Sequence, residues 1–153
     1  MRSVRDLAMG LRPSMLDDLG LEPALRWQAR EFSRHSGVQA TIETDGDLGR
    51  LSEPVRTCIY RVVQESLTNC ARHSEARNVR ILVHANQDRI SLTVQDDGKG
   101  FDPKTLVSRG LGLIGMEERI KKLGGTLAIS SQNLKNPKGT VLRVELPSVM
   151  EVS

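Results

Sequence analysis

Three polar residues recur at four-residue intervals in one segment of the chain. Glu65, Asn69 and His73 occupy positions i, i+4 and i+8, flanked by Arg61 and Arg72. On a helix they would form one stripe that drifts by only about 40° per step. A carboxylate can act as a general base, an amide oxygen suits Mg²⁺, and cationic groups suit phosphates. The stripe therefore indicates either a phosphate-handling cleft or a plain solvated helix face.

An acidic, glycine-containing segment follows an alternating apolar run. Asp96, Gly98 and Gly100 spell D-x-G-x-G. A calcium-binding loop would need acids at its third and fifth positions and a Glu at its twelfth. Gly98, Gly100 and Val107 stand there instead, so a calcium loop is excluded. An Asp-Gly turn and a loop whose carboxylate accepts a hydrogen bond both remain open.

A third glycine cluster precedes an expected helix. Gly110, Gly112 and Gly115 spell G-x-G-x-x-G, which is also the dinucleotide fingerprint. That fingerprint directly follows a strand and is trailed by an acid about 20 residues later. Here a loop precedes it, and Lys135 and Asn136 occupy the trailing region, which argues against a Rossmann site. What remains is a glycine-rich segment leading into a helix N-terminus, which favours an anion.

Hydrophobic periodicity predicts the elements that would position these residues. We expect helices over residues 4–11, 16–36, 52–74 and 113–123, and strands over residues 38–42, 79–83, 90–94, 127–129 and 142–146. Ser52 is the expected N-cap of the long helix, and Gly37 and Gly124 are expected stops. The fold class is therefore α+β: a mostly antiparallel mixed sheet with helices on one face and a less buried opposite face.

Composition limits the class of protein. The 153 residues are 38% hydrophobic and 3% aromatic, which fits one domain with an aliphatic core. No apolar run approaches the roughly 18 residues of a membrane span, and no signal peptide begins the chain. A net charge of +3 without clustered basic and aromatic residues is weak support for nucleic-acid binding. Cys58 and Cys70, about 18 Å apart on one helix, are expected to be reduced thiols in a cytoplasmic protein.

Taken in order, these motifs resemble those of a known family. "VVQESLTNCARHSEA", "QDDGKGFD" and "GLGLIGMEERIKKLGG" resemble the N, G1 and G2 boxes of the ATP-binding catalytic domain of bacterial sensor histidine kinases. The resemblance is to the branch that signals to LuxR/NarL-type response regulators. "LRPSMLDDLGLEPAL" resembles the connection from that branch's dimerisation helices, so the resemblance covers nearly the whole chain.

The resemblance implies a Bergerat-type ATP-binding fold, a two-layer sandwich, and roles for individual residues. Glu65 would support phosphoryl transfer, and Asn69 would be the Mg²⁺ ligand. Asp96 would accept a hydrogen bond from the adenine amino group. The residues it implies for ATP binding are Asn69, Arg72, His73, Asp96, Gly98, Gly100, Gly110, Gly112, Leu113, Gly115 and Thr140. Residues 102–109 would form a short lid.

The resemblance also implies an organisation and partners. Residues 1–20 would be the stub of a dimerisation helix and its connector, residues 21–149 the catalytic domain, and residues 150–153 a tail. The family's phosphoacceptor is a His followed by an acid, which none of His35, His73 and His84 matches. We therefore expect a fragment that cannot phosphorylate itself. Its partners would be its own dimerisation and phosphoacceptor domain and a LuxR/NarL-type regulator. The full-length protein would be a homodimer, either with or without a membrane anchor. This domain itself would contact neither membrane nor nucleic acid.

Three other functions of the same fold fit these residues less well. An anti-sigma-factor serine kinase shares the nucleotide boxes, but the connector segment favours a preceding dimerisation helix. A non-catalytic nucleotide-binding regulator is disfavoured because Glu65 and Asn69 are both present. A gyrase-like or chaperone-like ATPase would need a longer lid and further domains.

Overall fold

A five-stranded mixed sheet forms one layer of the molecule. The computed structural model describes residues 14–98, 113–132 and 139–148. The strands are β1 (Gln39–Asp45), β2 (Asn78–Ala85), β3 (Arg89–Asp96), β4 (Thr126–Gln132) and β5 (Gly139–Pro147). Their order is β1-β2-β3-β5-β4; β1 runs parallel to β2, and the other neighbours are antiparallel. The predicted antiparallel-dominated sheet is therefore confirmed.

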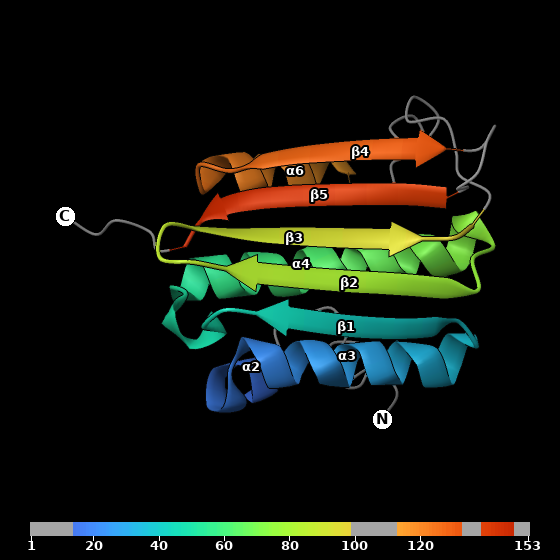
Figure 1. Ribbon diagram of the computed structural model, residues 1–153, viewed down its shortest axis with the longest axis horizontal. Helices are drawn as coiled ribbons and strands as arrows, with labels where there is room; N and C mark the ends of the chain where they lie inside the picture. The colour runs from blue at the N-terminus through green and yellow to red at the C-terminus, as the bar shows by residue number, and fades with distance from the viewer. Residues whose placement is uncertain (1–13, 99–112, 133–138, 149–153) are drawn as a thin grey trace.

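Helices form the second layer. They are α2 (Ser14–Leu19), α3 (Leu21–Ser36), α4 (Glu53–Asn69) and α6 (Leu113–Lys122), with a 3₁₀ turn at Leu48–Arg50 and a π-helical turn, η2, at Cys70–Ser74. Helices α4 and α6 lie behind the sheet in Figure 1, and α2 and α3 flank β1. The α+β prediction is thus confirmed. No helix within the described ranges is both long and apolar enough to cross a membrane.

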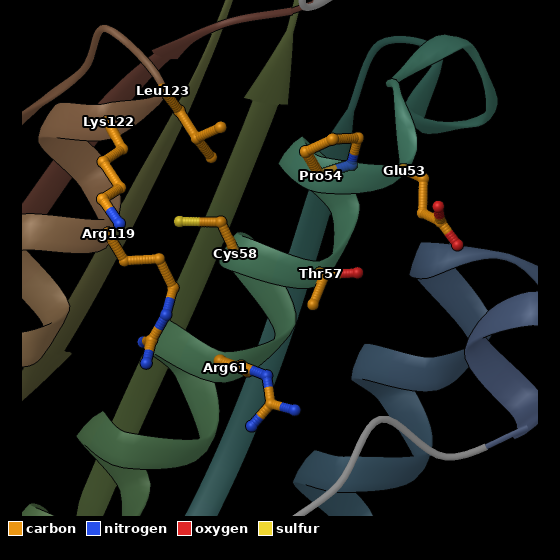
Figure 2. Close-up of a pocket in the computed structure, with 8 residues that line it drawn as sticks. All are labelled: Glu53, Pro54, Thr57, Cys58, Arg61, Arg119, Lys122 and Leu123. Carbon is orange, nitrogen blue, oxygen red and sulfur yellow. The ribbon is translucent and has the colours of Figure 1, made fainter.

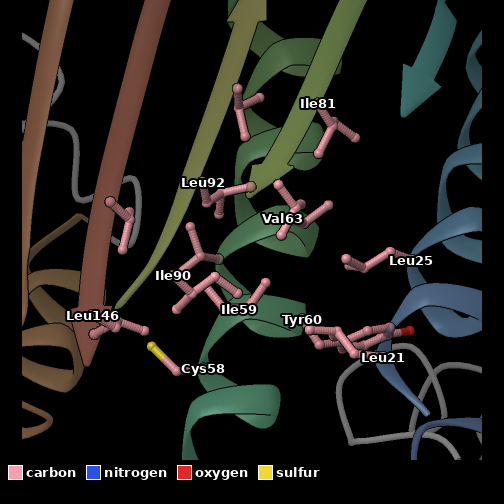
Figure 3. Close-up of a cluster of buried hydrophobic side chains, with 14 of the residues drawn as sticks. Leu21, Leu25, Cys58, Ile59, Tyr60, Val63, Ile81, Ile90, Leu92 and Leu146 are labelled. Atoms are coloured by element: carbon pink, nitrogen blue, oxygen red, sulfur yellow. The ribbon is translucent and has the colours of Figure 1, made fainter. Parts of the chain in front are cut away.

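The core lies between the sheet and α4. Alternate residues of β2 and β3, such as Ile81 and Leu92, are fully buried because successive strand residues face opposite sides of the sheet. Figure 3 shows them facing Ile59 and Val63 of α4. The expected apolar face of α4 and η2 is buried in full: Val55, Ile59, Val62, Val63, Leu67 and Cys70. Both cysteines are buried and free, as predicted.

The helix predicted over residues 16–36 is broken in two. Gly20 adopts a φ of 98°, which is outside the helical region and separates α2 from α3. The expectation of one continuous helix was therefore wrong, because apolar periodicity continues across a glycine whose backbone turns the chain. The predicted stop is confirmed: Gly37 is left-handed and its N–H donates to the Ser33 carbonyl. The helix predicted over residues 4–11 lies outside the described residues.

The second face of the sheet is polar, as the alternation predicted. Its exposed side chains pair across strands, with Arg80 3.5 Å from Glu43 and His84 Nδ1 2.8 Å from Asp45 Oδ2. Such exposed ion pairs contribute little to stability. The stabilisation of the sheet therefore comes from the face that α4 covers.

The buried position of Leu92 allows a direct test of this core. Leu92→Ala is expected to lower the free energy of unfolding by about 2–5 kcal/mol, because the surrounding side chains cannot fill the cavity. Leu19, which is 64% exposed, is the matched control, and Leu19→Ala should change it by no more than about 0.5 kcal/mol. Guanidinium chloride unfolding measures both. Equal effects of the two substitutions would contradict the core described above.

Candidate functional site

The ladder between β3 and β5 sets an acid against a hydroxyl. Asp96, the last residue of β3, pairs in register with Thr140, the second residue of β5. Directly opposed residues of antiparallel strands project from the same face. The carboxylate of Asp96 and the hydroxyl of Thr140 are therefore neighbours at one end of the sheet. The resemblance implied contact with the adenine amino group for Asp96 and a part in ATP binding for Thr140.

Asp96 is half-buried, and its surroundings disfavour its charged form. Burial raises the pKa of its carboxyl above the usual value, while the backbone N–H groups of Gly98 and Thr140 partly lower it and the charge of Asp97 raises it further. Its Oδ1 accepts a hydrogen bond of 2.9 Å from the Gly98 N–H. A ligand that donates a hydrogen bond to this carboxylate would replace part of its lost solvation.

The Thr140 hydroxyl has an unused hydrogen-bonding capacity. Thr140 is 7% exposed, and its Oγ1 is buried without a hydrogen-bond partner in the described parts of the chain. An unsatisfied buried polar group costs about 1–3 kcal/mol, so it is rare unless a ligand or water completes it. Next to an acceptor carboxylate, this hydroxyl fits a ligand edge that carries a donor beside an acceptor.

Gly139 permits the close approach on which this pairing depends. Its φ is 120°, and a Cβ built there would lie 1.9 Å from the Asp96 carbonyl oxygen. Any side chain at this position would force β5 away from the end of β3. The sequence alone does not reveal this role of Gly139, because the contact joins segments more than 40 residues apart.

Asp97 holds the end of β3 to the beginning of β2. Its Oδ1 accepts hydrogen bonds from the backbone N–H groups of Arg77 and Asn78, and its Oδ2 accepts one from Asn78 Nδ2, all at 2.9 Å. Burial alone would raise the pKa of this carboxyl, but these hydrogen bonds outweigh it and lower the pKa. Asp97 is therefore an exposed residue whose hydrogen bonds fix the backbone next to Asp96. Asp102 lies outside the described residues.

The polar stripe lies on the C-terminal half of α4. Glu65 and Asn69 are half-buried there, at the edge of the apolar face, since Asn69 follows the buried Val62 by about two helical turns. Figure 1 places this end of α4 at the same end of the molecule as the end of β3. Arg72 follows in η2 with an exposed side chain, and His73 lies in the same turn, although its side chain is outside the description. A π-helical turn of this kind is often found at functional sites.

The remaining residues predicted for ATP binding lie next to, or outside, the residues that the structure describes. Gly98 is buried in the turn after β3, and Gly115 is exposed in the first turn of α6, where a Cβ would meet no atom within 4 Å. Leu113 begins α6, but its side chain is not described. Gly100, Gly110, Gly112 and the expected lid over residues 102–109 lie outside the described residues.

The two neighbouring aspartates are expected to affect stability in opposite directions. For Asp96, whose folded-state pKa is raised above 3.8, the folded chain binds more protons, so stability falls as pH rises through that window. For Asp97, whose pKa is lowered, stability is present above the unfolded pKa and is lost as pH falls through the folded value. Without nucleotide at pH 7, Asp96→Asn should raise Tm and Asp97→Asn should lower it, as measured by calorimetry. A lower Tm for Asp96→Asn would contradict the assigned desolvation.

Known proteins are similar to this chain in sequence or in fold. The chain is 38% identical over 148 residues to the oxygen sensor histidine kinase NreB of Staphylococcus carnosus, covering 94% of this chain and 41% of that protein. It is 33% identical over 148 residues to the signal transduction histidine-protein kinase/phosphatase DegS of Brevibacillus brevis, covering 97% and 38%. The ATP-binding domain of PrrB from Mycobacterium tuberculosis superposes with a TM-score of 0.63 at 17% identity, covering 82% and 92%. At that identity the likeness shows the fold alone.

These comparisons bear on the family and on the extent of the chain. The chain spans less than half the length of the two curated relatives, 41% and 38%. The resemblance to the ATP-binding domain of sensor histidine kinases is confirmed, and residues 55–150 match the family of histidine kinase-, DNA gyrase B-, and HSP90-like ATPases. A chain matched over most of its length in this way belongs to that family of ATPases.

Proposed function

We propose that this chain binds Mg²⁺–ATP and presents the γ-phosphate to a histidine on a dimerisation domain in two-component signal transduction. The observation that carries the proposal is the orphaned Thr140 hydroxyl directly opposite the half-buried Asp96 carboxylate. This pair supplies a hydroxyl and a strong acceptor side by side. Family membership supports the ATP-binding part of the proposal.

At the adenine end, Asp96 accepts a hydrogen bond from the exocyclic amino group, and Thr140 reaches the neighbouring ring nitrogen. The Gly98 N–H keeps the carboxylate oriented through its 2.9 Å hydrogen bond to Oδ1. Guanine carries an oxygen where adenine carries its amino group, so it would face Asp96 with an acceptor. Two acceptors without a donor between them repel, which makes the pair selective for adenine.

At the phosphate end, Asn69 supplies an amide oxygen to the metal. Glu65, one turn earlier on α4, supports phosphoryl transfer. Arg72 contributes positive charge from η2, where its side chain is exposed. Mg²⁺, when bound, neutralises the charge that develops on the phosphates during transfer. The protein's own contribution is to hold these groups at the edge of the face of one rigid helix that is packed against the sheet.

The proposal for the whole protein extends beyond this chain. The phosphoacceptor histidine lies on the dimerisation domain, and the phosphoryl group passes from it to an aspartate of a LuxR/NarL-type response regulator. The full-length protein is a homodimer, and this domain works in the cytoplasm. Support comes from the two curated relatives, whose names describe histidine kinases, and from the connector segment that contains α2.

Nucleotide titration tests the adenine assignment. Asp96→Asn is expected to weaken a non-hydrolysable ATP analogue by about 1–3 kcal/mol, because the amide's donor group can face the adenine amino group. Asp88→Asn is the matched control: Asp88 is exposed in the turn at the opposite end of β3, and its loss of charge should leave affinity unchanged. Calorimetric titration measures each affinity. Equal affinity of the unmodified chain for ATP and GTP would overturn the role of Asp96.

The metal assignment has a separate signature. Asn69→Asp replaces a neutral ligand with a charged one, so we expect the Mg²⁺ concentration needed for half-maximal nucleotide binding to change, with little change in metal-free nucleotide binding. A metal titration at fixed nucleotide concentration measures this. An unchanged Mg²⁺ dependence would remove Asn69 from the metal site and leave the adenine assignment in place.

Transfer chemistry is tested by radiolabelling. Because His35, His73 and His84 do not match the family's phosphoacceptor, incubation of the chain with γ-labelled ATP should give nucleotide binding but no acid-labile phosphohistidine. Labelling of the chain on its own would show that the acceptor lies within these 153 residues.

A further inference from the structure

A second recess lies between α4 and α6. It has a volume of about 320 Å³, and its lining combines the apolar groups of Pro54, Cys58 and Leu123 with the cations of Arg61, Arg119 and Lys122. Figure 2 shows the Cys58 sulfur directed toward α6, from which Arg119 and Lys122 project, while the Arg61 guanidinium extends away from α6. Most of these side chains are exposed or half-buried, so the recess is open to solvent.

The charges around this recess are unbalanced. Among the described residues, three cations line it against a single carboxylate, that of Glu53. In the parts of the chain that the structure describes, Arg119 and Lys122 form no ion pair, whereas Lys121 on the same helix lies 3.9 Å from Glu117. A cation in the last turn of α6 interacts favourably with the helix dipole whichever way its side chain points. The dipole therefore does not explain why Arg119 and Lys122 face the recess.

The thiol at the base of the recess does not offset these charges. Burial raises the pKa of Cys58 to about 11, and the nearby Arg119 lowers it only in part. The thiol is thus uncharged at neutral pH and behaves as a small apolar group. The recess consequently pairs an apolar interior with two cations, Arg119 and Lys122, that have no ion-pair partner among the described residues.

The recess is separate from the candidate nucleotide site. Cys58 precedes Asn69 by eleven residues of α4, which corresponds to about 16 Å along the helix. Figure 1 places the start of α4 and the end of α6 at the end of the molecule opposite the C-terminal end of β3. Of the residues assigned to ATP binding that the structure describes, none lines it.

We propose that this recess binds a small organic anion, a carboxylate or phosphate monoester joined to a short apolar body. Its volume is at the lower end of the range of about 300–1,000 Å³ found for ligand sites, which combine apolar walls with a few convergent polar groups. Arg119 contacts the anionic head, since a guanidinium group binds carboxylate or phosphate oxygens in pairs. Lys122 adds a second charge from the same helix, and the apolar body lies against Leu123 and Cys58.

Titration of the isotope-labelled full chain with phenylacetate and phenyl phosphate tests the proposal. Both are expected to give saturable amide chemical-shift changes at Thr57, Cys58 and Leu123, and the tighter of the two identifies the preferred head group. Phenethylamine, which has the same apolar body and the opposite charge, should not bind. Combined Arg119→Gln and Lys122→Gln substitution should weaken binding at least tenfold, while the matched control Lys121→Gln should stay within twofold.

Several outcomes would overturn the proposal. They are equal shifts with inorganic phosphate alone, unchanged affinity in the double variant, or loss of phenylacetate binding in Asp96→Asn, which would place the anion at the nucleotide end. Lys122→Glu provides a second variant with altered charge: it should weaken both anions and improve phenethylamine binding. If it leaves the preference for anions unchanged, these cations do not bind the ligand.

Discussion

The burial of one face of α4 against the sheet is the constraint on which the rest of the structure depends. A fully buried Val, Leu or Ile side chain stabilises the fold by about 1.5–3 kcal/mol, and α4 contributes several of them. This packing determines the rotation of the helix about its axis. Once Ile59 and Val63 face the sheet, Glu65 and Asn69 must project toward the rim of the molecule. The direction of the polar stripe therefore follows from the core.

Two polar groups at the end of β3 are poorly satisfied in the chain by itself. Burial disfavours the charge on Asp96, and the opposed Thr140 hydroxyl lacks a partner among the described residues. Asp97, one residue later, has its pKa shifted in the opposite direction because it reaches three hydrogen-bond donors. Adjacent residues of the same type thus have different roles: one anchors the backbone and the other remains poorly solvated, as is typical of functional sites.

The two ends of α4 present different chemistry. The C-terminal half carries a carboxylate and an amide close to the end of β3, and the N-terminal half forms an apolar recess with cations from α6. Both use the same rigid helix, but they share no residue. At the N-terminal end of α4, the positive charge comes from Arg119 and Lys122 of α6. This helix follows the glycine-rich segment in the sequence.

Local pattern in the sequence determined most of the elements and led to the proposed site residues. Period-two alternation marked the strands, 3.6-residue periodicity marked α4, and the order of the motifs carried the resemblance that implies roles for Asp96 and Asn69. Tertiary structure alone decided the break at Gly20, the anchoring by Asp97 and the recess beside Cys58. It also decided why position 139 is glycine, because the atom that excludes a side chain there belongs to Asp96. Periodicity reports which residues are buried, whereas contacts between distant segments exist only after the strands have paired in register.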